Sequence, residues 1–191
     1  MQKLNAVILT DGYKGKKVID NIIDGILTVK QCNEIAVATN GGLYGSFREW
    51  LSSSPHKNKV KIISKEKEND LTEVFNTIKQ LHWEKNHILV LRDYSFKGIN
   101  EFYQRHVQSG KLITVAIKKP KILQKTDVFK EKKKISKRIA LSLYVFNCSF
   151  TRVLEDYIWR QNRGLKESHE KLTEYATGEQ SELEKEVGVY E

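Results

Sequence analysis

The 191-residue sequence contains few of the residues that restrict or cross-link a chain, with two prolines, two cysteines and one methionine. Cys32 and Cys148 each border an apolar run, which suits reduced core thiols better than a disulfide framework, and their spacing matches no metal site. No apolar run approaches the roughly 18 residues that a membrane helix needs, and the N-terminus lacks the regions of a secretory signal. We therefore expect a cytoplasmic protein without a membrane partner.

The composition is that of a folded domain, with 39% hydrophobic and 30% charged residues. Its net charge of +9 is unevenly distributed. The segment Lys118–Lys134 holds eight lysines against Asp127 and Glu131, a net charge of +6, and Glu167–Glu191 holds eight glutamates against two lysines, a net charge of −6. The lysine segment is either a solvated basic loop or a weak contact with RNA or another anion. Only Phe129 is available there for base stacking, which favours the solvated loop.

Apolar runs alternate with amphipathic segments along the chain, which predicts strands alternating with helices. Strands are expected at Leu4–Thr10, Glu34–Thr39, Val60–Ser64, His87–Leu91, Leu112–Ile117 and Ile139–Phe146. Helical faces are expected at Ile19–Leu27, Leu43–Leu51, Leu71–Leu81, Ile99–His106 and Phe150–Ile158, with Asp70 and Glu73 as a capping box. This order predicts an α/β three-layer sandwich with a mostly parallel sheet of about six strands. We assign residues 1–165 to this domain and 166–191 to a loosely packed acidic C-terminal tail.

Two segments follow strands at the edge where ligands collect in open α/β sheets. The first is the loop "LTDGYKGKK", whose Gly12 and Gly15 match neither the dinucleotide nor the Walker spacing. An ordinary tight turn explains these glycines, although the neighbouring lysines could attract an anion. The second is Asp93 in "HILVLRDYSF", which stands where a metal-binding carboxylate would stand or caps the turn before the helix that follows Gly98.

The order of these segments resembles the nucleotidyltransferase-like domain of sugar-phosphate nucleotidyltransferases. "NAVILTDGYKGKK" stands where that family reads roughly A-V-I-L-A-G-G-x-G-T-R, and "HILVLRDYSF" where it has a strand ending in Gly-Asp. "NDLTEVFNTIKQ" and "ALSLYVFNCSFTRVLEDY" match a helix start and the closing strand and helix. The resemblance spans Leu4 to about Leu165 and implies a nucleotide-diphospho-sugar transferase fold.

The resemblance also implies an active site that this chain has altered. The family holds nucleotide phosphates on a glycine loop and Mg²⁺ on aspartates, because phosphoryl transfer depends on positioning and charge neutralisation. Here Asp11 and Lys14 replace loop glycines, Lys16 falls at an arginine, and Arg92 replaces the glycine before Asp93. If the site is active, the resemblance assigns catalysis to Lys16 and Asp93, Mg²⁺ to Asp93, and nucleotide binding to four loop residues, Asp11, Gly12, Lys14 and Gly15.

A nucleotidyltransferase fold with a degenerate site is similar to the epsilon, and less closely the gamma, subunit of translation initiation factor 2B, a guanine-nucleotide exchange complex. "LTDGYKGKK" echoes the first loop of the epsilon subunit through Asp11 and Tyr13, and Arg163–Leu165 resembles a short stretch beyond its last helix. The resemblance implies a pseudoenzyme without a cofactor that acts in assembly or regulation and binds other subunits and initiation factor 2. Trp50, Trp83 and Trp159 are candidate anchors, with core packing as the alternative. The alternative function is an active sugar- or alditol-phosphate nucleotidyltransferase that uses Mg²⁺ and a nucleoside triphosphate.

Overall fold

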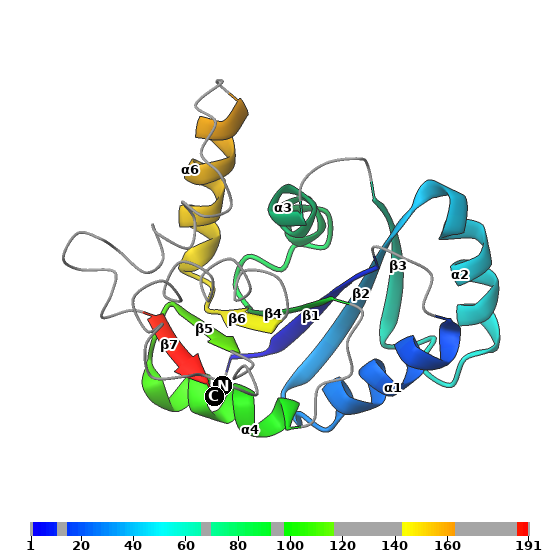
Figure 1. The fold of residues 1–191 in the computed structure, drawn as a ribbon, viewed down its shortest axis with the longest axis horizontal. Helices are drawn as coiled ribbons and strands as arrows, with labels where there is room; N and C mark the ends of the chain where they lie inside the picture. Colours follow the sequence, from blue (N-terminus) through cyan, green and yellow to red (C-terminus); the bar gives the residue numbers. More distant parts are fainter. Residues whose placement is uncertain are drawn as a thin grey trace, which may run out of the picture.

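The computed structural model describes residues 2–10, 15–65, 70–92, 98–116, 143–162 and 187–190. These residues form a mixed α/β fold in which helices cover both faces of one sheet, as expected (Figure 1). The strands are β1 (Leu4–Leu9), β2 (Cys32–Asn40), β3 (Val60–Lys65), β4 (His87–Arg92), β5 (Ile113–Ala116), β6 (Leu143–Phe146) and β7 (Val187–Tyr190). The helices are α1 (Lys16–Leu27), α2 (Gly41–Ser53), α3 (Asp70–Gln80), α4 (Ile99–Ser109) and α6 (Phe150–Asn162).

The sheet has the strand order β3-β2-β1-β4-β6-β5-β7. β1 lies between β2 and β4 and is parallel to both, and β3 continues the parallel half beyond β2. β6 is antiparallel to β4 and β5, whereas β7 is parallel to β5. The prediction of a mostly parallel sheet is therefore confirmed. The carboxyl ends of β1, β2, β3 and β4 all meet at one edge, where a ligand site is expected in such folds.

The seventh strand, β7, was not predicted from the sequence. It lies in the 166–191 segment, where we expected a loose tail, and it pairs with β5 from Val187 opposite Ile113 to Tyr190 opposite Ala116. Its residues, Val-Gly-Val-Tyr, include β-branched and aromatic side chains that suit a strand. The glutamates before it dominate the composition of the segment and hide this short signal. The rest of the tail and the Lys118–Lys134 segment lie outside the described residues.

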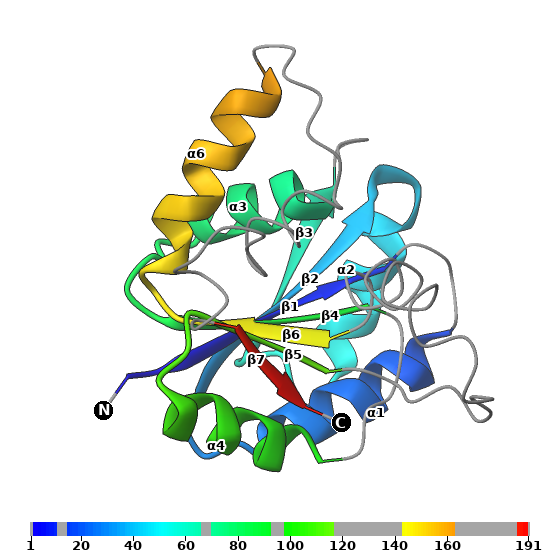
Figure 2. The same cartoon turned by 60° about the vertical axis from the view of Figure 1, so that its left-hand side comes forward.

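Two apolar layers hold the sheet between its helices. Helices α1, α2 and α4 cover one face, and α3 and α6 cover the other, where they also pack against each other (Figures 1 and 2). β4 is central, and its Ile88 and Val90 are at most 1% exposed, as the predicted position of this strand requires. Among the described residues, no helix is both long and apolar enough to cross a membrane.

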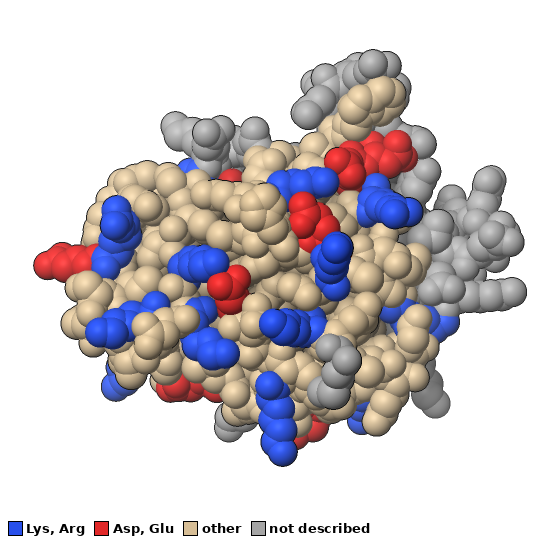
Figure 3. Space-filling view, turned by 180° about the vertical axis from the view of Figure 1, so that it is seen from behind, with Lys and Arg blue, Asp and Glu red and all other residues tan. Residues whose placement is uncertain are grey.

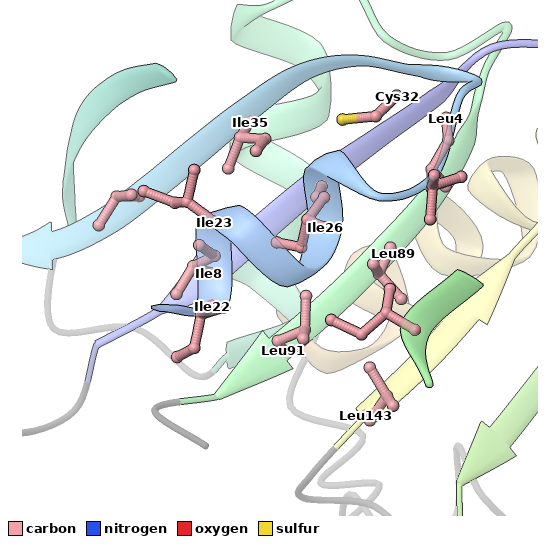
Figure 4. Packing of buried hydrophobic residues seen from close by; sticks show 14 of the residues in the cluster. Leu4, Ile8, Ile22, Ile23, Ile26, Cys32, Ile35, Leu89, Leu91 and Leu143 are labelled. Carbon is pink, nitrogen blue, oxygen red and sulfur yellow. The ribbon is translucent and has the colours of Figure 1, made fainter. Parts of the chain in front are cut away.

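Helix α1 shows how the sequence pattern produces this packing. Its four isoleucines, Ile19, Ile22, Ile23 and Ile26, recur at helical spacing and are all buried against β1 and β2 (Figure 4). Each fully buried isoleucine contributes about 1.5–3 kcal/mol relative to an exposed one. This stripe fixes α1 on the sheet, so its first turn lies beside the end of β1.

Candidate phosphate-binding site

The carboxyl edge of the parallel strands brings polar residues from distant parts of the sequence together. In the sheet register Leu9 lies opposite both Ala38 of β2 and Arg92 of β4, and Asn40 lies opposite Lys65 of β3. The last residues of these four strands therefore occupy adjacent positions along one edge. The loop after β1 starts in the middle of this row.

The first turn of α1 is the part of the predicted phosphate loop that the structure describes. Gly15 precedes the helix with φ 87° and ψ 143°, a conformation that side chains with a Cβ rarely adopt. The first turn has no acidic residue, and among the described residues no side chain caps this end and no atom lies within 4 Å of the position that a Cβ on Gly15 would take. The Val18 N–H donates to the Gly15 carbonyl at 3.1 Å, whereas the first N–H groups of an α-helix have no partner within it. These groups and the helix dipole favour an anion here, and Lys16 and Lys17 add positive charge.

The neighbouring helix α2 has a satisfied N-terminus by contrast. The Asn40 side chain accepts a hydrogen bond from the Leu43 backbone N–H at 3.1 Å, as a typical N-cap does. Thr10 fastens the end of β1 to β2, because both its N–H and its hydroxyl donate to the Ala38 carbonyl at 3.0 Å. Among the described residues, the N-terminus of α2 therefore has a side-chain cap and that of α1 has none.

At the end of β4, where the resemblance leads us to expect a glycine, this chain has Arg92. Its strand neighbour Val90 lies opposite Tyr144 of β6, and alternation along β4 places Arg92 on that same face of the sheet. Burial raises the pKa of Tyr144 well above its ordinary value, and the nearby positive charge of Arg92 opposes this rise only in part. Arg92 also has a further interaction partner. A large cationic side chain therefore lies where the resembling enzymes have bare backbone.

Glu73 is a buried carboxylate near the start of α3. The sequence predicts that it forms a capping box with Asp70; α3 begins at Asp70, and Glu73 is only 3% exposed. Glu73 has an interaction partner, as expected for a buried carboxylate, and lies in the first turn and a half of α3. The signal in the sequence was its place beside Val74 and Ile78 on the face that also buries Thr77.

Four predicted site residues, Asp11, Gly12, Lys14 and Asp93, lie outside the described residues. Of the predicted set, Gly15 and Lys16 are among the described residues, and both lie at the N-terminus of α1. Within the described part of the chain, no three His, Cys, Asp or Glu side chains are grouped as a metal site would require. An open hollow of about 370 Å³ lies elsewhere, between α1 and the end of α2, with the Asp24–His56 ion pair on its wall at 3.3 Å.

Comparison with solved structures identifies the fold. The chain superposes on 4-diphosphocytidyl-2C-methyl-D-erythritol synthase from Anaerococcus prevotii with a TM-score of 0.67 and 14% identity, covering 99% of this chain and 86% of that one. For a protein from Bacillus anthracis assigned as a glucose-1-phosphate thymidylyltransferase, the TM-score is 0.60, the identity 13% and the coverage 98% and 86%. For mannose-1-phosphate geranyltransferase from Thermus thermophilus, the values are 0.57, 13%, 98% and 73%.

These similarities show that the chain has the fold of the nucleotide-diphospho-sugar transferases, as the sequence predicted. Identities of 13% and 14% show the fold alone. No protein-family model and no curated protein matches the sequence.

Proposed function

We propose that this chain is a non-catalytic nucleotidyltransferase-like subunit of an exchange complex of the translation initiation factor 2B type, acting in assembly or regulation. The observation that carries the proposal is Arg92 at the carboxyl end of β4, directly beside the end of β1. Enzymes of this fold need room for the substrate at that point. The resembling family has a glycine at this position, so Arg92 adds a charged side chain there, on the face of the sheet that also carries Tyr144.

The first loop supports the same function. A phosphate needs bare backbone N–H groups at close range, and a Cβ or a carboxylate interferes with that approach. Asp11 and Lys14 stand at two glycine positions of the resembling family. A carboxylate in this loop repels phosphate, so base-selective nucleotide affinity should be poor.

The surface of the domain supplies one of the three tryptophans as a partner anchor. Trp83 is only 2% exposed, so its role is core packing, and Trp50 is half-buried against Phe47. Trp159 is 52% exposed on α6, which rises from the sheet (Figure 2). We assign the contact with other subunits of the complex, and with initiation factor 2, to the α6 side of the domain because exposed Trp is enriched at binding hot spots.

An active sugar- or alditol-phosphate nucleotidyltransferase is the second candidate. The open N-terminus of α1 favours it, since Gly15, Lys16 and the free N–H groups form part of an anion site. In this case Lys16 offsets phosphate charge, and Asp93 is the residue assigned to Mg²⁺. The transferases and the synthase that share the fold are named for chemistry of this kind.

Calorimetry with each nucleoside triphosphate, with and without Mg²⁺, separates the two functions. The non-catalytic function predicts no base-selective binding at near-physiological salt and no release of pyrophosphate with any sugar phosphate. Micromolar binding of one nucleotide that Lys16→Gln abolishes, and that the matched variant Arg48→Gln on α2 retains, would establish the transferase instead.

Purification from the native cell tests the complex itself. Translation-factor subunits should accompany the chain, and Asp93→Ala should leave that association nearly intact, because the ion pair expected from its place beside Arg92 in the sequence contributes only about 0–1 kcal/mol. Trp159→Ala should weaken it. If no translation factor travels with the wild-type chain, the proposed complex is wrong.

A further inference from the structure

The edge of the sheet opposite the candidate site carries a regular set of lysines. Each parallel strand from β1 to β5 is preceded within three residues by at least one lysine. These residues are Lys3 before β1, Lys30 before β2, Lys57 and Lys59 before β3, Lys85 before β4 and Lys111 before β5. Because parallel strands begin at the same edge, these six lysines, here called the amino-edge lysines, lie on one side of the molecule.

Backbone hydrogen bonds show that the segments bearing these lysines are continuous in space. The Lys3 carbonyl accepts a hydrogen bond from His87 at the start of β4, and the N–H of Leu4 donates to Gln31, which follows Lys30. On the far side of β2 the Lys59 carbonyl accepts from Ile35 at 2.8 Å. The row follows the strand order from β3 to β5, and five strand spacings of about 4.8 Å give it a length of roughly 24 Å.

Little nearby negative charge balances these lysines. Five of the six are exposed and Lys111 is half-buried, and none forms an ion pair with a carboxylate in the described part of the chain. Glu84 is the acidic residue in the segments that carry them, and Glu34 at the start of β2, whose charge also acts on Lys3, is bound by Lys61 and Trp83. The view from behind shows Lys and Arg spread over this side of the molecule, with fewer Asp and Glu between them (Figure 3).

We propose that the amino-edge lysines form a binding surface for the phosphate backbone of a nucleic-acid duplex. Lysine ammonium groups act as point charges toward phosphate, and contacts of this kind position a duplex without reading its sequence. The large hydrophobic side chains that are exposed on the described residues, Val107 and Trp159, lie outside these segments. The surface thus lacks the apolar core of a protein interface and the apolar face of a membrane-binding helix.

A duplex fits this surface better than a single strand. Proteins that hold single strands stack the bases on aromatic side chains, and Trp83, the tryptophan in these segments, is buried. The row of about 24 Å corresponds to about seven base pairs at 3.4 Å per step. The surface is independent of the proposed function, because it lies at the opposite edge of the sheet from the N-terminus of α1 and from Arg92.

Fluorescence anisotropy of the full chain with labelled RNA and DNA duplexes of about 20 base pairs tests the surface over a salt series. Six phosphate contacts predict a slope of log affinity against log salt near −5, and about a thousandfold loss between roughly 50 and 200 mM salt. Lys30→Gln with Lys85→Gln should make the slope shallower by about two, because each lysine contributes about 0.9. Equal slopes for RNA and DNA assign recognition to the phosphates. Tighter binding of one duplex identifies that kind of nucleic acid as the ligand.

Two control variants lose the same charge elsewhere. Arg48→Gln with Lys65→Gln changes α2 and the carboxyl end of β3, and Lys132→Gln with Lys133→Gln changes the lysine-rich segment. The proposal requires the shallower slope in the amino-edge variant and an unchanged slope in the Arg48/Lys65 variant. An amino-edge variant with the wild-type slope would overturn it, whether or not the Lys132/Lys133 variant binds more weakly. Tighter binding to a polyglutamate peptide than to either duplex would assign the surface to an acidic protein instead.

Discussion

Two parts of the interior bury side chains of different chemistry. Where α1 packs on β1 and β2, the buried groups are aliphatic, including Leu4, Ile8, Ile23 and Ile35 (Figure 4). Where α4 packs near the starts of β4 and β5, the interior holds four polar-tipped side chains, His87, Tyr103, His106 and Thr114, all at most 7% exposed. The stability of the first region should not depend on pH, whereas that of the second should.

The polar region is a small network around two histidines. His106 Nδ1 lies 2.9 Å from the Thr114 hydroxyl, and the rings of His87 and His106 meet edge to face with centroids 5.1 Å apart. Burial lowers the pKa of His106 to about 4, with a smaller contribution from nearby His87, whose own pKa burial also lowers. Both histidines are therefore neutral in the folded protein at pH 7. One part of the core is therefore stabilised by buried apolar surface, whereas the stability of the other also depends on its two histidines staying neutral.

The largest expected effect is in the aliphatic region. Ile23→Ala removes a side chain with no exposure and leaves a cavity, so the free energy of unfolding should fall by about 2–5 kcal/mol. Urea unfolding followed by circular dichroism measures this loss. It should be the same at pH 7 and pH 5, because the described residues of its cluster include no group that titrates between these values; the pKa of Cys32 is about 11. Asn21→Ala on the exposed face of α1 is the matched control, and an equal loss there would contradict the packing described.

Lowering the pH should destabilise the polar region. The pKa of a histidine in the unfolded chain is near 6.5, and that of His106 in the folded chain is about 4, so the unfolded state binds more protons between these values. The free energy of unfolding should therefore be fully retained above pH 6.5 and fall as the pH drops toward 4, by about 3 kcal/mol for His106 alone. Urea unfolding at a series of pH values measures the slope.

His106→Gln separates this effect from general acid denaturation. Glutamine can still bond Thr114 but cannot titrate, so the slope between pH 6.5 and 4 should decrease by up to one proton. Glu34 acts in a lower window, because its pKa is lowered from 4.5, first by its hydrogen bond with Lys61. An unchanged slope in His106→Gln would show that His106 titrates normally in the folded protein.

Much of the fold could be predicted because its elements are strongly periodic. The spacing of the isoleucines in α1 and the apolar runs of β1 and β4 leave few other arrangements. The buried polar residues could not be predicted in this way. His87 and His106 meet only through tertiary packing, and Glu73 resembles a surface capping residue until α3 is placed on the sheet.

The position of the candidate site could be predicted from the sequence, but not all of the residues around it. Its position follows from the rule for parallel strands, and Gly15 and Lys16 lie there as expected. Tyr144, however, reaches the neighbourhood of Arg92 only because β6 inserts antiparallel between β4 and β5. Strand order is a long-range property, so no local spacing in the sequence indicated that contact.

Trp83 combines features of the two regions. Its ring is buried, and its indole Nε1 donates a hydrogen bond to Glu34 Oε2 at 2.8 Å. Trp83→Phe keeps an aromatic ring and removes the donor. We expect a loss of about 1–2 kcal/mol in the free energy of unfolding, from the hydrogen bond to a charged group and a small packing defect. A loss below that of an exposed control, Trp159→Phe, would show that water replaces the bond without cost.

The smallest expected effect concerns the other partner of the same carboxylate. Lys61 Nζ lies 2.8 Å from Glu34 Oε1, but the two side chains are 46% and 31% exposed, so solvent screens the pair. Lys61→Gln should therefore cost only about 0–1 kcal/mol at low salt and less at high salt. The bond from Trp83 holds Glu34 in both proteins, which limits the loss further. Lys85→Gln, which removes an exposed lysine without an ion pair among the described residues, is the control in urea unfolding at two salt concentrations. A salt-independent loss above about 2 kcal/mol would show that Glu34 behaves as a buried charge rather than as a surface charge that solvent screens.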